Sequence, residues 1–252
     1  MNYTVEKISK DDFSPKNVAL VQLMKVSLLL RFIWEYSDKI RKEIGGWFFN
    51  GRVSDLDFGT DEFVTNKNRM GLFKEEMVNH FHTHLFKTIG SKKSYTDKYK
   101  PPSGQDFFSV LYAGSEPHRE FVLVKSGVWI IEPVIRFYDR RILKAITAYY
   151  QMVQLLFMNE NFISLKRIKT KNKKRKRAMI ERIAVRSYIV SIEKINLELL
   201  SWVEHPDAKE WLNAMLYKNG YMPIENYIEI LESLKEKNIV KLRFVKWYSI
   251  IG

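Results

Sequence analysis

Three of the five histidines of the chain stand at alternate positions in one short segment, as His80, His82 and His84. Imidazole nitrogens are common ligands of zinc, manganese and nickel, so this cluster could support metal chemistry. Apolar residues recur at four-residue spacing around it, which predicts a helix over residues 72–89. On such a helix Glu76, His80 and His84 share one face and could hold a divalent metal. The same apolar stripe favours a simpler interpretation, a packed helix whose histidines bind no metal.

If the segment is a strand instead, His82 and His84 project from the same side of it. It then resembles the metal site of replication-initiator nucleases, in which a His-hydrophobic-His strand holds the metal and a tyrosine is the nucleophile. The resemblance implies Tyr95 or Tyr99 as that nucleophile. The chain departs from the pattern, because a threonine separates the two histidines and the tyrosines follow them closely.

Two aspartates form a second candidate site. Gly45-Gly46 are followed by Ser54-Asp55-Leu56-Asp57-Phe58, and on a strand Asp55 and Asp57 would face the same side, as a pair of Mg²⁺ ligands must. The pattern resembles the glycine turn and Asp-x-Asp motif of the nucleotidyltransferase superfamily, which implies metal-dependent phosphoryl transfer. Only Glu132, at the end of an expected strand, suggests itself as a third carboxylate. The alternative is a polar turn, which Asp and Gly favour.

The positive charge is concentrated in one segment. The net charge is +13, and residues 166–186 hold eleven Lys and Arg against one acid, which leaves +3 for the rest of the chain. Phosphates relieve the repulsion within such a run and release their counterions on binding, so it predicts contact with DNA or RNA. The open alternatives are a solvated linker or nuclear-import signal, and contact with an acidic membrane or protein surface. The expected phosphate contacts are Lys166, Arg167, Lys169, Lys171, Lys173, Lys174, Arg175, Lys176, Arg177, Arg182 and Arg186.

The composition bounds the remaining possibilities. The absence of cysteine excludes disulfides, Cys-ligated zinc, iron–sulfur clusters and thiol nucleophiles. A hydrophobic content of 46% is enough for a sizeable core. The N-terminus has no signal-peptide pattern, and the most apolar stretch is interrupted by polar residues. We therefore expect no membrane span and an intracellular, cytoplasmic protein, or a nuclear one in a eukaryotic host.

Periodicity predicts an α+β fold that is predominantly helical. Two apolar runs, residues 121–124 and 128–131, flank Lys125-Ser126-Gly127 and predict an antiparallel hairpin, to which residues 108–112 could add a third strand. A short C-terminal strand is expected over residues 239–247. Long helices are expected from Ser14-Pro15 to Gly45, from Pro133 to about residue 159 and over residues 178–203, with shorter ones over 207–217 and 223–237. This organisation predicts a helix-rich core at 1–165 with the central hairpin, a basic segment at 166–177, and a helical region at 178–252 packed on the first as one domain.

Charge, the most distinctive feature, favours a nucleic-acid-binding accessory or regulatory protein over an enzyme, acting with other proteins of a nucleoprotein assembly. An alternative is a metal-dependent phosphoryl-transfer enzyme, either nucleotidyltransferase-like or a nuclease. A third is an interaction or linker protein whose basic run is a targeting signal. The only cofactor suggested is a divalent metal.

Overall fold

The computed structural model describes residues 18–60, 78–85, 99–158, 173–199 and 223–251; within these, the side chains of 173–177, 180 and 181 are not described. The chain divides into two compact units, which are treated separately below. The first comprises Met1–Pro101, Pro117–Ile131 and Arg243–Gly252, and the second comprises Pro102–Glu116 and Glu132–Leu242.

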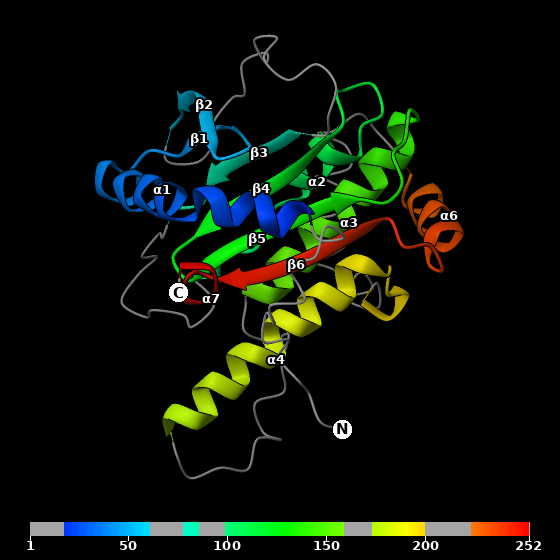
Figure 1. Cartoon of the computed structure of the whole chain (residues 1–252). Helices are drawn as coiled ribbons and strands as arrows, with labels where there is room; N and C mark the ends of the chain where they lie inside the picture. The colour runs from blue at the N-terminus through cyan, green and yellow to red at the C-terminus, as the bar shows by residue number, and fades with distance from the viewer. Residues whose placement is uncertain (1–17, 61–77, 86–98, 159–172, 200–222, 252) are drawn as a thin grey trace. The chain divides into compact units, whose positions relative to one another are not determined.

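The described strands form one six-stranded mixed sheet in the order β2-β1-β3-β4-β5-β6 (Figure 1). The pairs β1–β2, β1–β3 and β4–β5 are antiparallel, whereas β3 and β4 are parallel. The expectation of a predominantly helical chain with a small hairpin or three-stranded sheet was therefore wrong, and the class is mixed α/β. The strands are β1 (Ile44–Phe49), β2 (Arg52–Phe58), β3 (Val78–Thr83), β4 (His118–Val124), β5 (Gly127–Pro133) and β6 (Val240–Lys246).

Strands β1 and β2 form a hairpin where sequence analysis predicted a helix end and a loop. Asn50 and Gly51 connect them, and both have positive φ, 50° and 85°. An Asn-Gly pair in this conformation is the preferred two-residue turn between antiparallel strands, because its twist matches that of the strands. Phe49 pairs with Arg52 directly beside the turn. The turn residues thus fix the pairing of β1 with β2 beside the turn, and a register shift between Gly45 and Trp47 interrupts that pairing further along.

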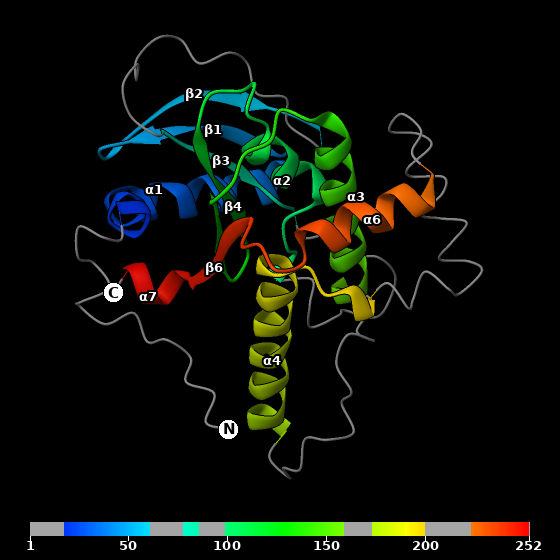
Figure 2. The same ribbon diagram turned by 90° about the vertical axis from the view of Figure 1, so that its right-hand side faces the viewer.

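The first unit has its hydrophobic core on one face of the sheet. Helix α1 (Val18–Ile40) lies along this face, close to β1, β3 and β4 (Figure 2). The short helix α7 (Trp247–Ile251), which sequence analysis did not predict, packs beside α1. The core between these elements includes Leu23 and Leu30 from α1, Phe48 from β1, Phe81 from β3, and Phe121 and Leu123 from β4.

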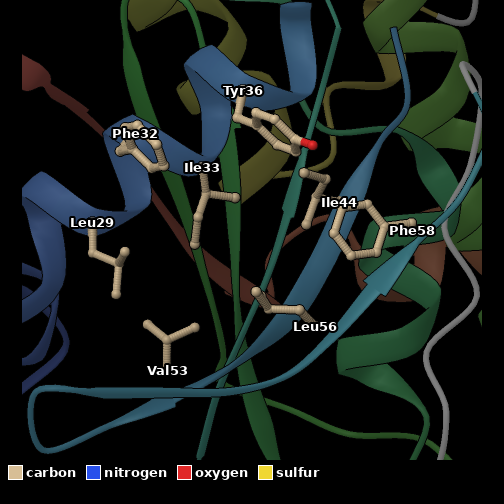
Figure 3. A pocket seen from close by; sticks show the side chains of 8 residues that line it. All are labelled: Leu29, Phe32, Ile33, Tyr36, Ile44, Val53, Leu56 and Phe58. Atoms are coloured by element: carbon tan, nitrogen blue, oxygen red, sulfur yellow. The ribbon is translucent and has the colours of Figure 1, made fainter. Parts of the chain in front are cut away.

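Helix α1 also has apolar residues on its outer side. Together with the β1–β2 hairpin they line an open apolar groove (Figure 3). Phe32 in this groove is 64% exposed. Contiguous exposed apolar surface is typical of protein contact sites. The lining residues are Leu29, Phe32, Ile33 and Tyr36 of α1 with Ile44, Val53, Leu56 and Phe58 of the hairpin.

The second unit is built around α3 (Arg140–Met158), on which α2 (Gly104–Leu111), α4 (Lys173–Glu193) and α6 (Ile224–Leu234) pack. The possible third strand at 108–112 was wrong. Those residues belong to α2, which begins with a capping box formed by Ser103 and Asp106. Gly104 is required by packing, since a Cβ there would lie 2.3 Å from the carbonyl oxygen of Thr147.

Most of the helices expected in the C-terminal half are present with shifted ends. The helix expected from Pro133 begins at Arg140, because β5 continues to Pro133. The helix expected at 178–203 spans 173–193, and the helix and strand expected at 223–237 and 239–247 are α6 and β6. The helix expected at 207–217 lies outside the described residues. Among the helices that the structure describes, none is long and apolar enough to span a membrane.

Candidate metal centre

The face of the sheet opposite α1 carries buried ionisable side chains in the first unit. His80 and His82 of β3 point to this face, and His84 follows them, held to β4 by a hydrogen bond from its N–H to the Leu123 carbonyl oxygen (2.8 Å). The parallel register of β3 and β4 places Glu120 beside His80. All four side chains are buried, and Glu120 is only 1% exposed. Burying so many polar groups is costly unless they are paired, so their partners define the site.

His82 and His84 converge through their Nε2 atoms, which lie 3.1 Å apart. The Nδ1 of His82 lies 2.7 Å from Oε1 of Glu120, and the Nδ1 of His84 lies 3.2 Å from the carbonyl oxygen of Lys100. A carbonyl oxygen and an ionised carboxylate only accept hydrogen bonds, so each Nδ1 donates. With the proton of each neutral ring on Nδ1, both Nε2 atoms are acceptors, so a proton on one ring or a cation between the rings must satisfy the pair. A cation between them would satisfy both.

The separation suits a metal ion. With zinc–nitrogen bonds of about 2.0–2.1 Å in tetrahedral geometry, two ligand nitrogens lie about 3.3 Å apart. The partners on Nδ1 are also of the kind found at metal sites. A histidine that binds metal through one nitrogen commonly donates its other N–H to a carboxylate or a backbone carbonyl, which fixes the tautomer and the ring orientation. His82 has the first arrangement and His84 has the second.

Glu120 stays ionised in this environment. Burial by itself would raise the pKa of the carboxyl group, but the charge of His80 and hydrogen bonds from His80 and His82 outweigh it and hold the pKa well below its usual range. The carboxylate is within hydrogen-bond distance of both rings, with His80 Nδ1 at 2.8 Å from Oε1 and 2.7 Å from Oε2. His118 Nε2 lies 3.7 Å from Oε2. Glu120 is therefore the anionic centre of the cluster.

Glu43 supplies a second buried carboxylate from the neighbouring strand. The β1–β3 register pairs Gly45 with His82, and continuing it two residues beyond the strand ends would place Glu43 opposite His84. Its backbone is held by hydrogen bonds with Gly59 (2.9 Å) and Thr60 (2.6 Å), and its Oε1 lies 3.7 Å from Lys100 Nζ. Residues directly opposite on antiparallel strands project to the same face. Gly45, opposite His82, leaves space there because it has no side chain.

Hydrogen bonds from the opposite face hold the histidine strand in place. The Oγ1 of Thr83 accepts a hydrogen bond from the Ile44 N–H (2.8 Å) and lies 2.7 Å from the Oγ of Ser37. The indole of Trp34 donates to the carbonyl oxygen of His84 (3.2 Å). His84 is therefore anchored through its backbone carbonyl, and the strand beside His82 is anchored through the side chain of Thr83.

Replacing Thr83 with valine should lower the free energy of unfolding by about 1–3 kcal/mol. The side chain keeps its shape, but the buried Ile44 N–H loses its acceptor. Urea denaturation measures the change. Ser54→Ala is the control, since the Ser54 hydroxyl donates to the neighbouring, exposed Asp55 (3.1 Å), and a surface change of this kind costs under about 0.5 kcal/mol. Equal stability of Thr83→Val and wild type would contradict this account of the anchor.

The helix predicted over residues 72–89 was wrong where it can be compared, because residues 78–83 form β3. All six residues of β3 are buried, so the strand lacks the alternation of polar and apolar residues that marks a strand with one exposed face. Of the ligand set Glu76, His80 and His84, Glu76 lies outside the described residues. His84 points its Nε2 at His82, whereas His80 faces Glu120.

The other predicted site residues are not brought together in the described part of the chain. Asp55 is exposed and has a positive φ of 53°, which interrupts the regular strand geometry that would place Asp55 and Asp57 on one side. Gly45-Gly46 lie within β1 and not in a turn. Tyr99 is buried with its ring against Phe244, a placement that does not favour a nucleophile, and Tyr95 lies outside the described residues.

The basic segment is described only in part. Lys166, Arg167, Lys169 and Lys171 lie outside the described residues. Lys173, Lys174, Arg175, Lys176 and Arg177 form the first turns of α4, without described side chains, and Arg182 and Arg186 are exposed on the same helix.

Sequence reasoning missed Glu43, His118 and Glu120. The alternation His118-x-Glu120 repeats that of His80 and His82 and was the available signal. Comparison of the chain with protein-family models, with curated proteins and with solved structures found no match, so the chemistry of this site carries the functional argument.

Proposed function

We propose that this protein is a metal-dependent hydrolase in which His82 and His84 hold the metal ion. One observation carries the proposal: the Nδ1 atoms of both rings lie within hydrogen-bond distance of fixed acceptors, and the two Nε2 atoms lie 3.1 Å apart. A bound cation explains why two basic atoms are held so close inside the protein. Zinc fits best, because hydrolytic zinc sites use histidine and carboxylate ligands and keep one position open for water.

Glu43 is the proposed general base. The metal would lower the pKa of a bound water toward neutrality, which makes the water a nucleophile. Glu43 is buried and faces the same side of the sheet as His84. Its carboxylate takes a proton from the attacking water and returns it to the leaving group. The oxygen of that water forms a bond to the carbonyl carbon of an amide, the C–N bond breaks, and a carboxylic acid and an amine are released.

An amide is the substrate class that this donor set favours. Zinc peptidases bind a single zinc through two histidines and one carboxylate, so they share two histidine ligands with this pair, whereas many phosphoester hydrolases clamp both reacting oxygens between two metals.

Hydrolysis measured before and after removal of metal tests the proposal. Protein treated with a chelator should cleave neither a fluorogenic peptide library nor a casein substrate, and stoichiometric zinc should restore cleavage. His84→Ala should stay inactive after zinc is added. Cleavage of a phosphodiester but not of amides would redirect the proposal to phosphoryl transfer. Cleavage that is insensitive to both chelator and His84→Ala would refute it.

Nucleic-acid binding is a second candidate function, and one observation favours it independently. The basic run enters α4 at Lys173, and Arg182 and Arg186 are exposed on that helix at four-residue spacing. Residues at this spacing lie on one helix face and can extend a positive stripe. Such a stripe can contact successive phosphates of DNA or RNA.

Removing charge from this run should weaken binding to nucleic acids of every base sequence to the same extent. If about five phosphates are contacted, Gln replacements at Lys173, Lys174, Arg175, Lys176 and Arg177 should reduce the slope of log K against log salt by roughly 4 to 5. Fluorescence titration at several salt concentrations measures it. Gln at Lys235, Lys237 and Lys241, which are exposed elsewhere, is the control and should leave the slope nearly unchanged. An unchanged slope in the first variant would exclude these contacts.

A further inference from the structure

We propose that Glu120 and His80 are positioning residues that prepare His82 to bind the metal. The inference rests on the proposed function, since it concerns the same metal. Neither residue needs to touch the metal or the substrate. Glu120 acts through His82, and His80 acts through Glu120. All three residues lie in the first unit.

Glu120 fixes the tautomer of His82. Its Oε1 lies 2.7 Å from Nδ1 of His82, which places the ring proton on Nδ1 and leaves the lone pair on Nε2. Without this acceptor the ring could carry its proton on Nε2, which would block metal binding, or rotate about its Cβ–Cγ bond. The side chain of Glu120 is 2% exposed, so solvent cannot readily replace it as the acceptor. A carboxylate behind a metal-binding histidine commonly contributes about 10–100-fold to metal affinity or activity.

His80 holds the carboxylate in the required orientation. Its Nδ1 lies 2.7 Å from Oε2 and 2.8 Å from Oε1 of Glu120, so it contacts both oxygens while Oε1 also faces His82. The ring of His80 packs edge-on against Trp47, with the ring centroids 4.8 Å apart. These contacts leave Glu120 little freedom to rotate away from His82.

His80 has this arrangement at a cost to stability. Its Nε2 is buried and has no hydrogen-bond partner among the described residues. An unsatisfied buried ring nitrogen is unfavourable, and a residue selected for packing alone would avoid it. An orienting role for Nδ1 explains why a histidine is placed here. The stacked order of His80, Glu120 and His82 then forms a chain of contacts that ends at the metal.

The same atoms suggest one competing arrangement. Ligand atoms of His80, His82 and Glu120 lie within 4.8 Å of one another, so the three could hold an ion themselves. Hydrogen bonds at 2.7–2.8 Å already account for these contacts. The positioning role predicts one metal per chain, whereas the competing arrangement predicts an ion that depends on His80.

Zinc affinity of the full chain, measured by competition with a chromophoric chelator, tests the inference. Glu120→Ala should bind zinc about 10–100-fold more weakly than wild type. Glu120→Gln, which keeps an acceptor oxygen, should lose less, and His80→Gln should also weaken binding. The absorption bands of the cobalt-substituted protein should change in Glu120→Ala, because His82 is reoriented.

Phe48→Leu is the matched control. Phe48 is fully buried on the opposite face of the sheet, so this variant should lose stability and keep its zinc affinity. Unchanged zinc affinity and cobalt spectrum in both Glu120 variants would overturn the inference, as would two zinc ions per chain with one lost in His80→Gln. If Glu120→Ala does not fold, Glu120→Gln decides. Failure of the proposed function can be distinguished from failure of this inference. If the proposed function fails, the wild type itself binds no zinc, and His84→Ala does not change the zinc content.

Discussion

Replacing Glu43 with glutamine is expected to lower the rate of hydrolysis by about 10²–10⁴-fold, the usual contribution of a general base. Glutamine keeps the size and shape of the side chain but cannot take a proton from water. The bound zinc should stay, because His82 and His84 keep their geometry. The expected pattern is therefore a loss of kcat in a protein with full metal content, measured by steady-state kinetics and elemental analysis.

The matched control for this variant is Glu35→Gln. Glu35 lies on α1 in an exposed ion pair with Arg31, so its loss should affect neither kcat nor metal content. Full activity of Glu43→Gln would show that another group is the base. Loss of zinc from Glu43→Gln would instead make Glu43 a metal ligand, with the base to be sought elsewhere.

Truncating Trp129 to alanine is expected to lower the free energy of unfolding by about 3–5 kcal/mol, the usual range for an aromatic cavity. The side chain is fully buried and its ring packs on Phe244, with the ring centroids 4.7 Å apart. Its indole N–H also donates to the carbonyl oxygen of Tyr99 (2.6 Å). The substitution removes both the packing and the donor. Urea denaturation measures the change.

This position also links stability to the site, because Tyr99 immediately precedes Lys100, whose carbonyl oxygen accepts from His84. Trp129→Phe keeps most of the packing and loses only the donor, so it should cost less than Trp129→Ala. A cost below about 1 kcal/mol for the alanine variant, the level of a surface substitution, would contradict the burial of Trp129.

The sequence around Trp129 predicts a strand of the hairpin, but it does not identify the neighbours of the side chain. The apolar run 128–131 marks a strand covered on both faces. Val128 and Ile130 face the core with α1, while Trp129 faces the other side and packs on Phe244. Alternate side chains of a strand point to opposite faces of the sheet. The sequence alone did not show which set of alternate residues faces α1 and which faces Phe244.

Elements whose signals are local could be predicted. The β4–β5 hairpin follows from two β-branched runs beside a turn, and α1 follows from its apolar periodicity. The Asn50-Gly51 turn carried an equally local signal for β1 and β2. It was overlooked because the surrounding Gly and Asp residues also suit a loop.

The site itself depends on contacts between distant parts of the chain. When the histidine segment is interpreted as a strand instead of a helix, His82 and His84 form a pair, since alternate residues of a strand share a side. No local pattern identifies the strand that pairs with β3, and the parallel pairing of β3 with β4 is what brings Glu120 beside His80. Register between strands forty residues apart is a property of the folded sheet.

The most direct test is the zinc stoichiometry of the full chain, measured by equilibrium dialysis of chelator-treated protein. The proposed centre predicts one tightly bound zinc per chain in wild type and its loss in both His82→Ala and His84→Ala, provided that circular dichroism shows the variants to be folded. A wild-type chain that binds no zinc, or variants that bind it as tightly as wild type, would contradict the assignment of His82 and His84 as a metal centre.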